Sequence, residues 1–175
     1  MTRSRVVPYS EEYRQLSGKF HCGNVHIDAF LRSSDSLNEN ICKTYVYLND
    51  DSSEIIGFYS ISTGCIEQDD AGFIFKMGGS IHITDFALDE NYHGWEMEEG
   101  NIKVNLSDVL LIDCLDRIKD LKGKVGFSFV TLNATKQGYP LYKRNDFEEI
   151  EEDMRIPKDK QESDCIPMYL ALELM

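Results

Sequence analysis

One short stretch of this chain combines side chains that suit group transfer to an amine. Between Asn133 and Phe147, a run rich in β-forming residues ends and a short helical segment that carries Tyr142 begins. An asparagine amide and a phenol beside one cleft can bind an acyl donor and protonate its leaving group. A tyrosine in such a place is also a common packing residue. The stretch alone therefore leaves two roles open for Tyr142, general acid and core side chain.

The segments around this stretch predict a mixed layer of strands and helices. Strands are predicted where β-branched and aromatic residues are concentrated or alternate with polar ones. These segments are 44–48, 55–62, 80–88, 127–132 and 168–172, with a short edge strand at Val6 and Val7 before Pro8. Apolar residues at helical spacing predict helices at 25–40 and 106–121. The order of the elements predicts an α/β (α+β mixed sheet) fold with helices packed on the sheet.

No helix is predicted in three further segments. Gly78-Gly79 separates two strands, residues 1–19 are polar apart from the edge strand, and residues 89–105 form a long loop around the only tryptophan, Trp95. Long loops inside a compact domain are often functional. His93 and Trp95 can form a lid over an acceptor, or Trp95 can anchor the loop to the core. The acidic run 146–153 is predicted to be a solvated strand edge.

The composition predicts one acidic cytoplasmic domain that spans residues 1–175. The net charge is −13 and the pI is near 4.6, so charge argues against a nucleic-acid partner, which needs clustered Lys and Arg. The five cysteines are widely spaced and include no CxxC pair, which indicates reduced thiols, and no metal site is predicted. No apolar run is long enough for a secretory signal or a membrane span, so no membrane partner is predicted.

Several motifs, taken in order along the chain, resemble one enzyme superfamily. They are Phe20-x-Cys22-Gly23 with Ile27-Asp28-x-Phe30-Leu31-Arg32, the run Ile-Gly-Phe-Tyr-Ser-Ile-Ser at 56–62, Phe86-Ala87-Leu88-Asp89, and Leu141-Tyr142-x-x-x-Asp146-Phe147. From about residue 20 to its C-terminus, the chain resembles the GNAT superfamily of acyl-CoA-dependent N-acetyltransferases. The opening motif is most similar to the toxin-like subgroup that acetylates aminoacyl-tRNA.

The resemblance implies a fold and a donor site. The fold would be a single-domain GNAT-like acyl-CoA N-acyltransferase fold, whose central mixed sheet is splayed between the fourth and fifth strands and has helices on both faces. Backbone groups of Phe86, Ala87 and Leu88 would pair with the pantetheine arm of acetyl-CoA, and Asn133 would complete the slot. Tyr142 would protonate the departing thiolate, because the amine attacks directly and no Ser or Cys nucleophile is needed.

The strand at 80–88 also carries two candidate proton relays, His82 and Asp85. The resemblance places this strand on the side of the acceptor, where either side chain can take a proton from the amine. His82 equally fits a histidine whose hydrogen bonds are satisfied within the sheet. Both roles of His82 therefore stay open.

The chain departs from the family where the diphosphate of coenzyme A should bind. Family members carry glycines at the start of the long helix, so that backbone N–H groups can approach the phosphates. One alignment places residues 102–107 there, without either glycine, and Asp108 follows at the helix start. A second alignment takes Asn91-Tyr-His-Gly94 as the motif, followed by an insertion. Asp146 also stands where glycine usually precedes Phe147. The diphosphate-binding residues implied by the first alignment are Lys103, Val104, Asn105, Leu106, Ser107 and Asp108.

Together these observations predict an acetyl-CoA-dependent N-acetyltransferase that acts on a primary amine in a ternary complex, with Tyr142 as general acid. The alternative is a GNAT-like protein that binds coenzyme A weakly or not at all and acts through protein contacts, which the missing glycines favour. The predicted partners are an amine-bearing acceptor and either a second copy of the chain, as a homodimer, or a partner protein. The acidic charge favours a polyamine, an amino sugar or a protein amine over aminoacyl-tRNA.

Overall fold

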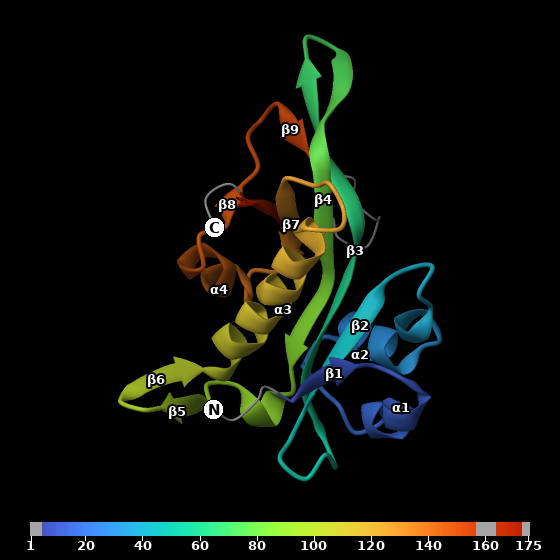
Figure 1. Cartoon of the computed structure of the whole chain (residues 1–175), viewed down its shortest axis with the longest axis vertical. Coiled ribbons are helices and arrows are strands. Elements are labelled where there is room, and N and C mark those ends of the chain that lie inside the picture. The colour runs from blue at the N-terminus through green and yellow to red at the C-terminus, as the bar shows by residue number, and fades with distance from the viewer. Residues whose placement is uncertain (1–4, 157–163, 173–175) are drawn as a thin grey trace. The chain divides into compact units, whose positions relative to one another are not determined.

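The computed structural model describes residues 5–156 and 164–172, and the chain divides into two compact units. Unit 1 contains residues 1–61 and 85–117, and unit 2 contains residues 62–84 and 118–175. Three elements that Figure 1 labels contribute residues to both units: strands β3 (Ile55–Asp70) and β4 (Phe73–Leu88) and helix α3 (Leu106–Lys122). The single domain over residues 1–175 stays a prediction.

Unit 1 contains antiparallel strands that match the predicted ones. Strand β1 (Val6–Pro8) pairs with β2 (Lys43–Leu48), which pairs with the first part of β3. Strand β1 stands at the end of the strand order of the described residues, so Pro8 lies at a sheet edge, where a missing N–H is tolerated. The strand predicted at 44–48 and the edge strand before it are confirmed.

Helix α2 (Val25–Arg32) begins where predicted, but it ends at Arg32 rather than at Asn40. The side chain of Asn24 caps its start. At its end, Ser33 is extended and its hydroxyl donates to the carbonyl of Phe30 at 2.8 Å. Such local hydrogen bonds of serine compete with the helical ones, which explains the early end.

Two short elements near α2 were not predicted. Helix α1 (Glu11–Ser17) lies in the polar segment 1–19, where no helix was predicted. Glu11 and Glu12 stand in its first turn, where the helix dipole favours negative charge. A 3₁₀ helix, η1 (Asp35–Leu37), follows α2 in place of the predicted helix.

Unit 2 contains a mixed sheet, as predicted. Strand β4 pairs in parallel with β7 (Phe129–Ala134), which pairs in antiparallel fashion with β10 (Ile166–Ala171). Strand β8 (Glu148–Glu149) pairs with β10 and ends the strand order, and both of its glutamates are exposed, as expected for a solvated acidic edge. Strand β9 (Met154–Arg155) pairs with the outer part of β3. Helix α4 (Tyr139–Arg144) follows β7.

Strand β4 is longer than predicted, because it already begins at Phe73. Gly78 and Gly79 therefore lie inside the strand, and the prediction that they separate two strands is wrong. A Cβ atom on Gly78 would stand 2.7 Å from a ring carbon of Phe129, so glycine lets the ring of the neighbouring strand approach the backbone. The parallel register with β7 runs from Ser80 opposite Phe129 to Ile83 opposite Leu132.

The segment 89–105 is not the predicted long loop. It forms a 3₁₀ turn, η2 (Glu90–Tyr92), and a hairpin of β5 (Glu96–Glu99) and β6 (Ile102–Asn105). Gly100 adopts a φ of 66° in the hairpin turn, a conformation that glycine adopts without steric cost. Helix α3 starts directly after β6 (Figure 1).

The helix predicted at 106–121 is confirmed as α3, and one of its faces is buried in the core. Leu110, Leu111 and Cys114 of α3 have no exposed surface. On β3, a Cβ atom added to Gly57 would stand 2.7 Å from Leu88 and 3.0 Å from Leu110, so this glycine allows the end of β4 and the start of α3 to pack closely. None of the described helices is long and apolar enough to cross a membrane.

Candidate active site

At the end of β4, the backbone N–H and C=O groups of successive residues point to opposite sides of the strand. Asp89 donates its N–H to the carbonyl of Ile56 on β3 at 3.0 Å, and the carbonyl of Ala87 also faces β3, next to Gly57. Backbone groups of successive strand residues alternate in direction, so the carbonyl of Leu88 points to the other side. There it accepts a hydrogen bond from Nε2 of His93 at 3.0 Å.

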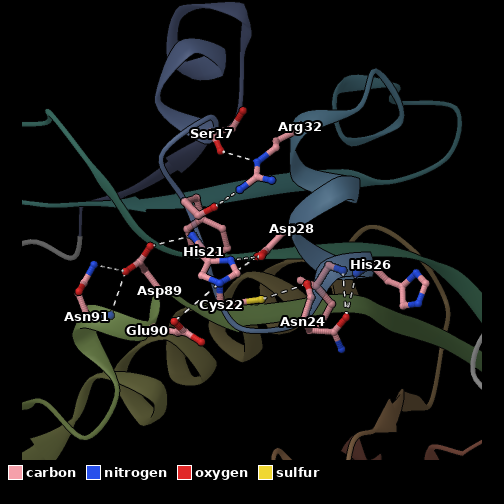
Figure 2. Close-up of polar contacts among 12 residues, drawn as sticks. Ser17, His21, Cys22, Asn24, His26, Asp28, Arg32, Asp89, Glu90 and Asn91 are labelled. Atoms are coloured by element: carbon pink, nitrogen blue, oxygen red, sulfur yellow. Dashed lines mark hydrogen bonds and ion pairs between the residues drawn. The ribbon is translucent and has the colours of Figure 1, made fainter.

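The turn after β4 is fixed by the buried carboxylate of Asp89. One of its oxygens accepts the backbone N–H of His21 at 2.9 Å, and the other accepts both N–H groups of Asn91, at 3.0 Å from the backbone and 2.9 Å from the side chain. Glu90 in turn donates its N–H to the carbonyl of His21 at 2.8 Å. Figure 2 shows how these contacts join the turn to the Phe20–Asn24 segment.

A second buried carboxylate, that of Asp28, organises this segment (Figure 2). It accepts the backbone N–H of Cys22 at 2.8 Å and the Nδ1–H of His21 at 2.5 Å. Burial pushes the pKa of Asp28 upward, but its hydrogen bonds with Cys22 and His21 outweigh this effect and leave the pKa below its usual value. Burial, with a smaller effect from Asp28, raises the pKa of the Cys22 thiol to about 12, so this thiol is not a nucleophile at neutral pH.

These two carboxylates are functional candidates that the motif residues alone did not reveal. Asp28 and Asp89 belong to the quoted motifs, but their contacts join segments that are far apart in the sequence. The sequence did offer one signal for these contacts. An acidic residue on an otherwise apolar helix face, or at the end of an apolar strand, must find hydrogen-bond donors if it is buried.

The six residues predicted to bind the diphosphate divide between two elements. Lys103, Val104 and Asn105 lie on β6, and the other three form the first turn of α3. Lys103 lies 3.7 Å from Glu96 across the hairpin, and both side chains are exposed. The N–H of Leu106, at the start of α3, donates to the carbonyl of Trp95 at 3.0 Å. The hairpin thus occupies the segment that the second alignment treats as an insertion.

The two ends of the implied donor site therefore differ in how well they suit coenzyme A. The pantetheine arm is rich in amides and suits a strand end whose carbonyl points away from β3, as that of Leu88 does. This oxygen already accepts one hydrogen bond from His93 and has a second lone pair. The diphosphate is served less well, because the N–H of Leu106 is already used and Lys103 already lies near a carboxylate.

Unit 2 carries the other two predicted residues. Asn133 is half-buried on β7, opposite Pro167 of β10. Tyr142 lies on α4 and is 6% exposed, with its ring edge-on to Phe147 at a centroid distance of 5.7 Å. A Cβ atom on Gly138 would stand 3.2 Å from this ring, so the glycine makes room for it.

Three further predictions about single residues can be compared with the structure. Asp146 has a φ of 66°, so the position where the family carries glycine needs a left-handed backbone here too. His82 lies 2.9 Å from the hydroxyl of Thr131, which matches a histidine satisfied within the sheet. Trp95 is 57% exposed and contacts Tyr92 at a centroid distance of 5.3 Å, so it does not anchor the segment to the core, and that alternative is wrong.

Comparisons with known proteins agree with this description. No protein-family model matches the chain. A structure of AtaTR bound with acetyl-CoA aligns over 99% of this chain and 96% of its own, with a TM-score of 0.75 and 13% identity. The chain has the GNAT-like fold of the AtaT toxin. The resemblance to the toxin-like subgroup is thereby confirmed at the level of the fold.

Two further relatives point to the same group. In sequence, the GNAT-like chain is 27% identical over 140 residues to a probable toxin TacT from Sinorhizobium fredii (strain NBRC 101917 / NGR234), which covers 74% of the chain and 72% of the relative. A structure of AtaT complexed with acetyl-methionyl-tRNAfMet aligns over 89% of the chain and 95% of its own, with a TM-score of 0.68 and 15% identity. Other structures with this fold include AtaT bound to the C-terminus of the antitoxin AtaR, a KacTA–DNA complex, and tyrosine-to-phenylalanine mutants of AtaT and KacT.

Proposed function

We propose that this GNAT-like protein is an acetyl-CoA-dependent N-acetyltransferase that acetylates a primary amine by direct attack in a ternary complex. The observation that carries the proposal is the likeness to the acetyl-CoA-bound AtaTR structure over 99% of the chain. Acetyl-CoA supplies an activated thioester, so that the protein needs no nucleophile of its own. This agrees with the raised pKa of Cys22 and with the burial of Cys114.

In the proposed donor site, unit 1 would hold acetyl-CoA through the backbone of the β4 end. Phe86, Ala87 and Leu88 would pair with the pantetheine arm, and an N–H of this segment would stabilise the oxyanion of the attacked carbonyl. Lys103 and the first turn of α3, from Leu106 to Asp108, would face the diphosphate. Support comes from the direction of the Leu88 carbonyl, which faces away from β3.

In the proposed transfer step, Asn133 and Tyr142 would act as the resemblance implies, with Tyr142 as the general acid. The C–N bond forms as the amine displaces the thiol, and Tyr142 would donate its hydroxyl proton to the sulfur as the C–S bond breaks. The proton lost by the amine would restore the phenol through solvent. Mutants in which a tyrosine is replaced by phenylalanine were also made in AtaT and KacT, which supports a functional tyrosine in this fold.

The acceptor class has two candidates, each favoured by a different observation. The net charge of −13 favours a small or protein-borne amine without nucleic acid. The AtaT complex with acetyl-methionyl-tRNAfMet favours the amino group of an aminoacyl-tRNA. Acetylation assays with labelled acetyl-CoA, polyamines and charged tRNA at low and high salt distinguish them. Transfer to tRNA that is lost steeply with added salt would contradict the first candidate.

Calorimetry tests the proposed donor. We expect acetyl-CoA to bind the protein, and we expect pantetheine analogues that lack the nucleotide to retain much of the affinity, because the strand end suits the arm better than the helix start suits the diphosphate. The absence of any heat at millimolar acetyl-CoA would contradict the proposal. It would favour a GNAT-like protein that acts through protein contacts, the candidate function supported by the pairing of Lys103 with Glu96.

The substitution Tyr142→Phe tests the proposed general acid. We expect kcat to fall by about 10²- to 10⁴-fold with little change in the Kd of acetyl-CoA, because the hydroxyl would act only as the thiol leaves. Tyr139→Phe is the matched control on the same helix, since its hydroxyl bonds to exposed Glu149 at 2.7 Å. Equal turnover in the two variants would remove Tyr142 from the mechanism.

A further inference from the structure

The carbonyl of Leu88 is the best-defined backbone acceptor of the β4 end, and it already has a partner. His93 donates from Nε2 to this oxygen at 3.0 Å, on the side of the strand that faces away from β3. On that side the proposed function places the amide groups of the pantetheine arm. A carbonyl oxygen can accept two hydrogen bonds in principle, but an imidazole nitrogen at 3.0 Å competes with any donor that approaches the oxygen from the same side.

The position of His93 follows from the turn that precedes it. The 3₁₀ turn Glu90–Tyr92 reverses the chain, and the N–H of His93 donates to the carbonyl of Glu90 at 3.2 Å. The base of the turn is held by the buried carboxylate of Asp89 and by the two backbone contacts with His21 (Figure 2). The turn is therefore fixed at its start and directs the histidine back onto the strand that it has just left.

The ring itself is held much less firmly than the turn. His93 is an exposed residue, and its described side-chain contact is the single hydrogen bond to Leu88. A hydrogen bond of this kind shifts an equilibrium by only about 2- to 10-fold, so rotation of the side chain away from the strand costs little. The turn is therefore fixed at its base, whereas the His93 side chain can rotate away from the carbonyl of Leu88.

We propose that His93 is a positioning residue of the donor site, which occupies the carbonyl of Leu88 in the free protein and is displaced when a pantetheine amide takes that carbonyl. This inference rests on the proposed function. A competing internal hydrogen bond weakens binding, because the ligand can bind only the fraction of molecules in which the carbonyl is open. The apparent Kd equals the intrinsic Kd divided by that fraction. His93 therefore sets how tightly the acyl donor binds, and it acts on the arm rather than on the nucleotide.

The substitution His93→Ala tests the proposal by calorimetry with two ligands. We expect the Kd of acetyl-CoA to fall by about 2- to 10-fold, because the competing bond is gone. The nucleotide half of coenzyme A, which has no pantetheine amide, should bind wild type and variant equally. His93→Gln keeps a side-chain donor and should return the Kd toward the wild-type value. His26→Ala, an exposed histidine of α2 in the same unit, is the matched control and should leave both affinities unchanged.

The outcomes separate this inference from the proposed function. If wild type binds acetyl-CoA and His93→Ala binds it no more tightly, the inference is wrong while the proposed function stands. An equal gain for the nucleotide half also contradicts it, since the effect would then not act through Leu88. If neither protein binds acetyl-CoA, the proposed function and the inference fail together. Uptake of acetyl-CoA by the variant alone would support the inference in its strongest form.

Discussion

Two stretches of unit 1 flank the end of β4 and are held in opposite ways. The segment from Phe20 to Asp28 is fixed by the buried carboxylates of Asp28 and Asp89. The β5–β6 hairpin instead carries exposed Trp95 and Ile102, and its described ion pair is a surface one. The first stretch carries residues that resemble the GNAT opening motif, and the second contains Lys103, which is predicted to face the diphosphate. The difference indicates that the strand end predicted to hold the thioester is fixed by buried hydrogen bonds, whereas the segment predicted to face the diphosphate has exposed contacts.

The largest effect expected from this comparison is on stability. Asp28→Ala should lower the free energy of unfolding by about 3 kcal/mol, because it leaves the buried N–H of Cys22 without its acceptor and removes the partner of His21. Glu96→Ala removes a carboxylate of the hairpin and should cost less than about 0.5 kcal/mol, since its contact with Lys103 is exposed. Urea denaturation of both variants measures the contrast. Similar losses in the two variants would show that burial does not distinguish these stretches.

The contrast between the two stretches also explains what the sequence could predict. Local patterns were sufficient for the strands at 44–48 and 80–88 and for the helix from Leu106, because periodicity is a property of neighbouring residues. The contact of His21 with Asp89 joins residues 68 positions apart, and no local pattern contains it. The site residues on Phe86–Leu88 and Tyr142 came from motif resemblance, and their roles stay predictions.

The hairpin was missed for a different reason. Its strands contain Glu96, Glu98 and Lys103, which are uncommon in strands, and these charges concealed the alternation of Met97 with its neighbours. The turn at Gly100-Asn101 was an available signal, since such a pair between two short runs is typical of a tight hairpin turn. The helix predicted at 25–40 is longer than α2, because apolar residues at helical spacing continue past Ser33, which follows the end of α2.

The second prediction concerns the stability of the protein at acidic pH. The folded pKa of Asp28 lies below its usual value, so the group binds protons more readily in the unfolded chain, and the stability that it contributes is present above the unfolded pKa of about 4. This stability is lost as the pH falls through the lower folded pKa. Wild type and Glu96→Gln should therefore lose stability together on acidification below about pH 4, and Asp28→Asn should lose less. Parallel curves for all three proteins, followed by urea denaturation at several pH values, would contradict the assigned role of Asp28.

The smallest effect is expected at the hairpin, in donor affinity. Lys103→Ala should raise the Kd of acetyl-CoA by about 2- to 3-fold at low salt, because an exposed lysine acts on a phosphate across water. Glu96→Gln should lower the Kd by a similar factor, since it removes the carboxylate that lies 3.7 Å from the Lys103 ammonium. Both changes should vanish at high salt, where exposed charges are screened. Calorimetry measures the Kd of both variants. An increase in Kd of 100-fold or more with Lys103→Ala would instead mean that the hairpin forms a diphosphate-binding site, and that the strand end and the hairpin both contribute to binding of the donor.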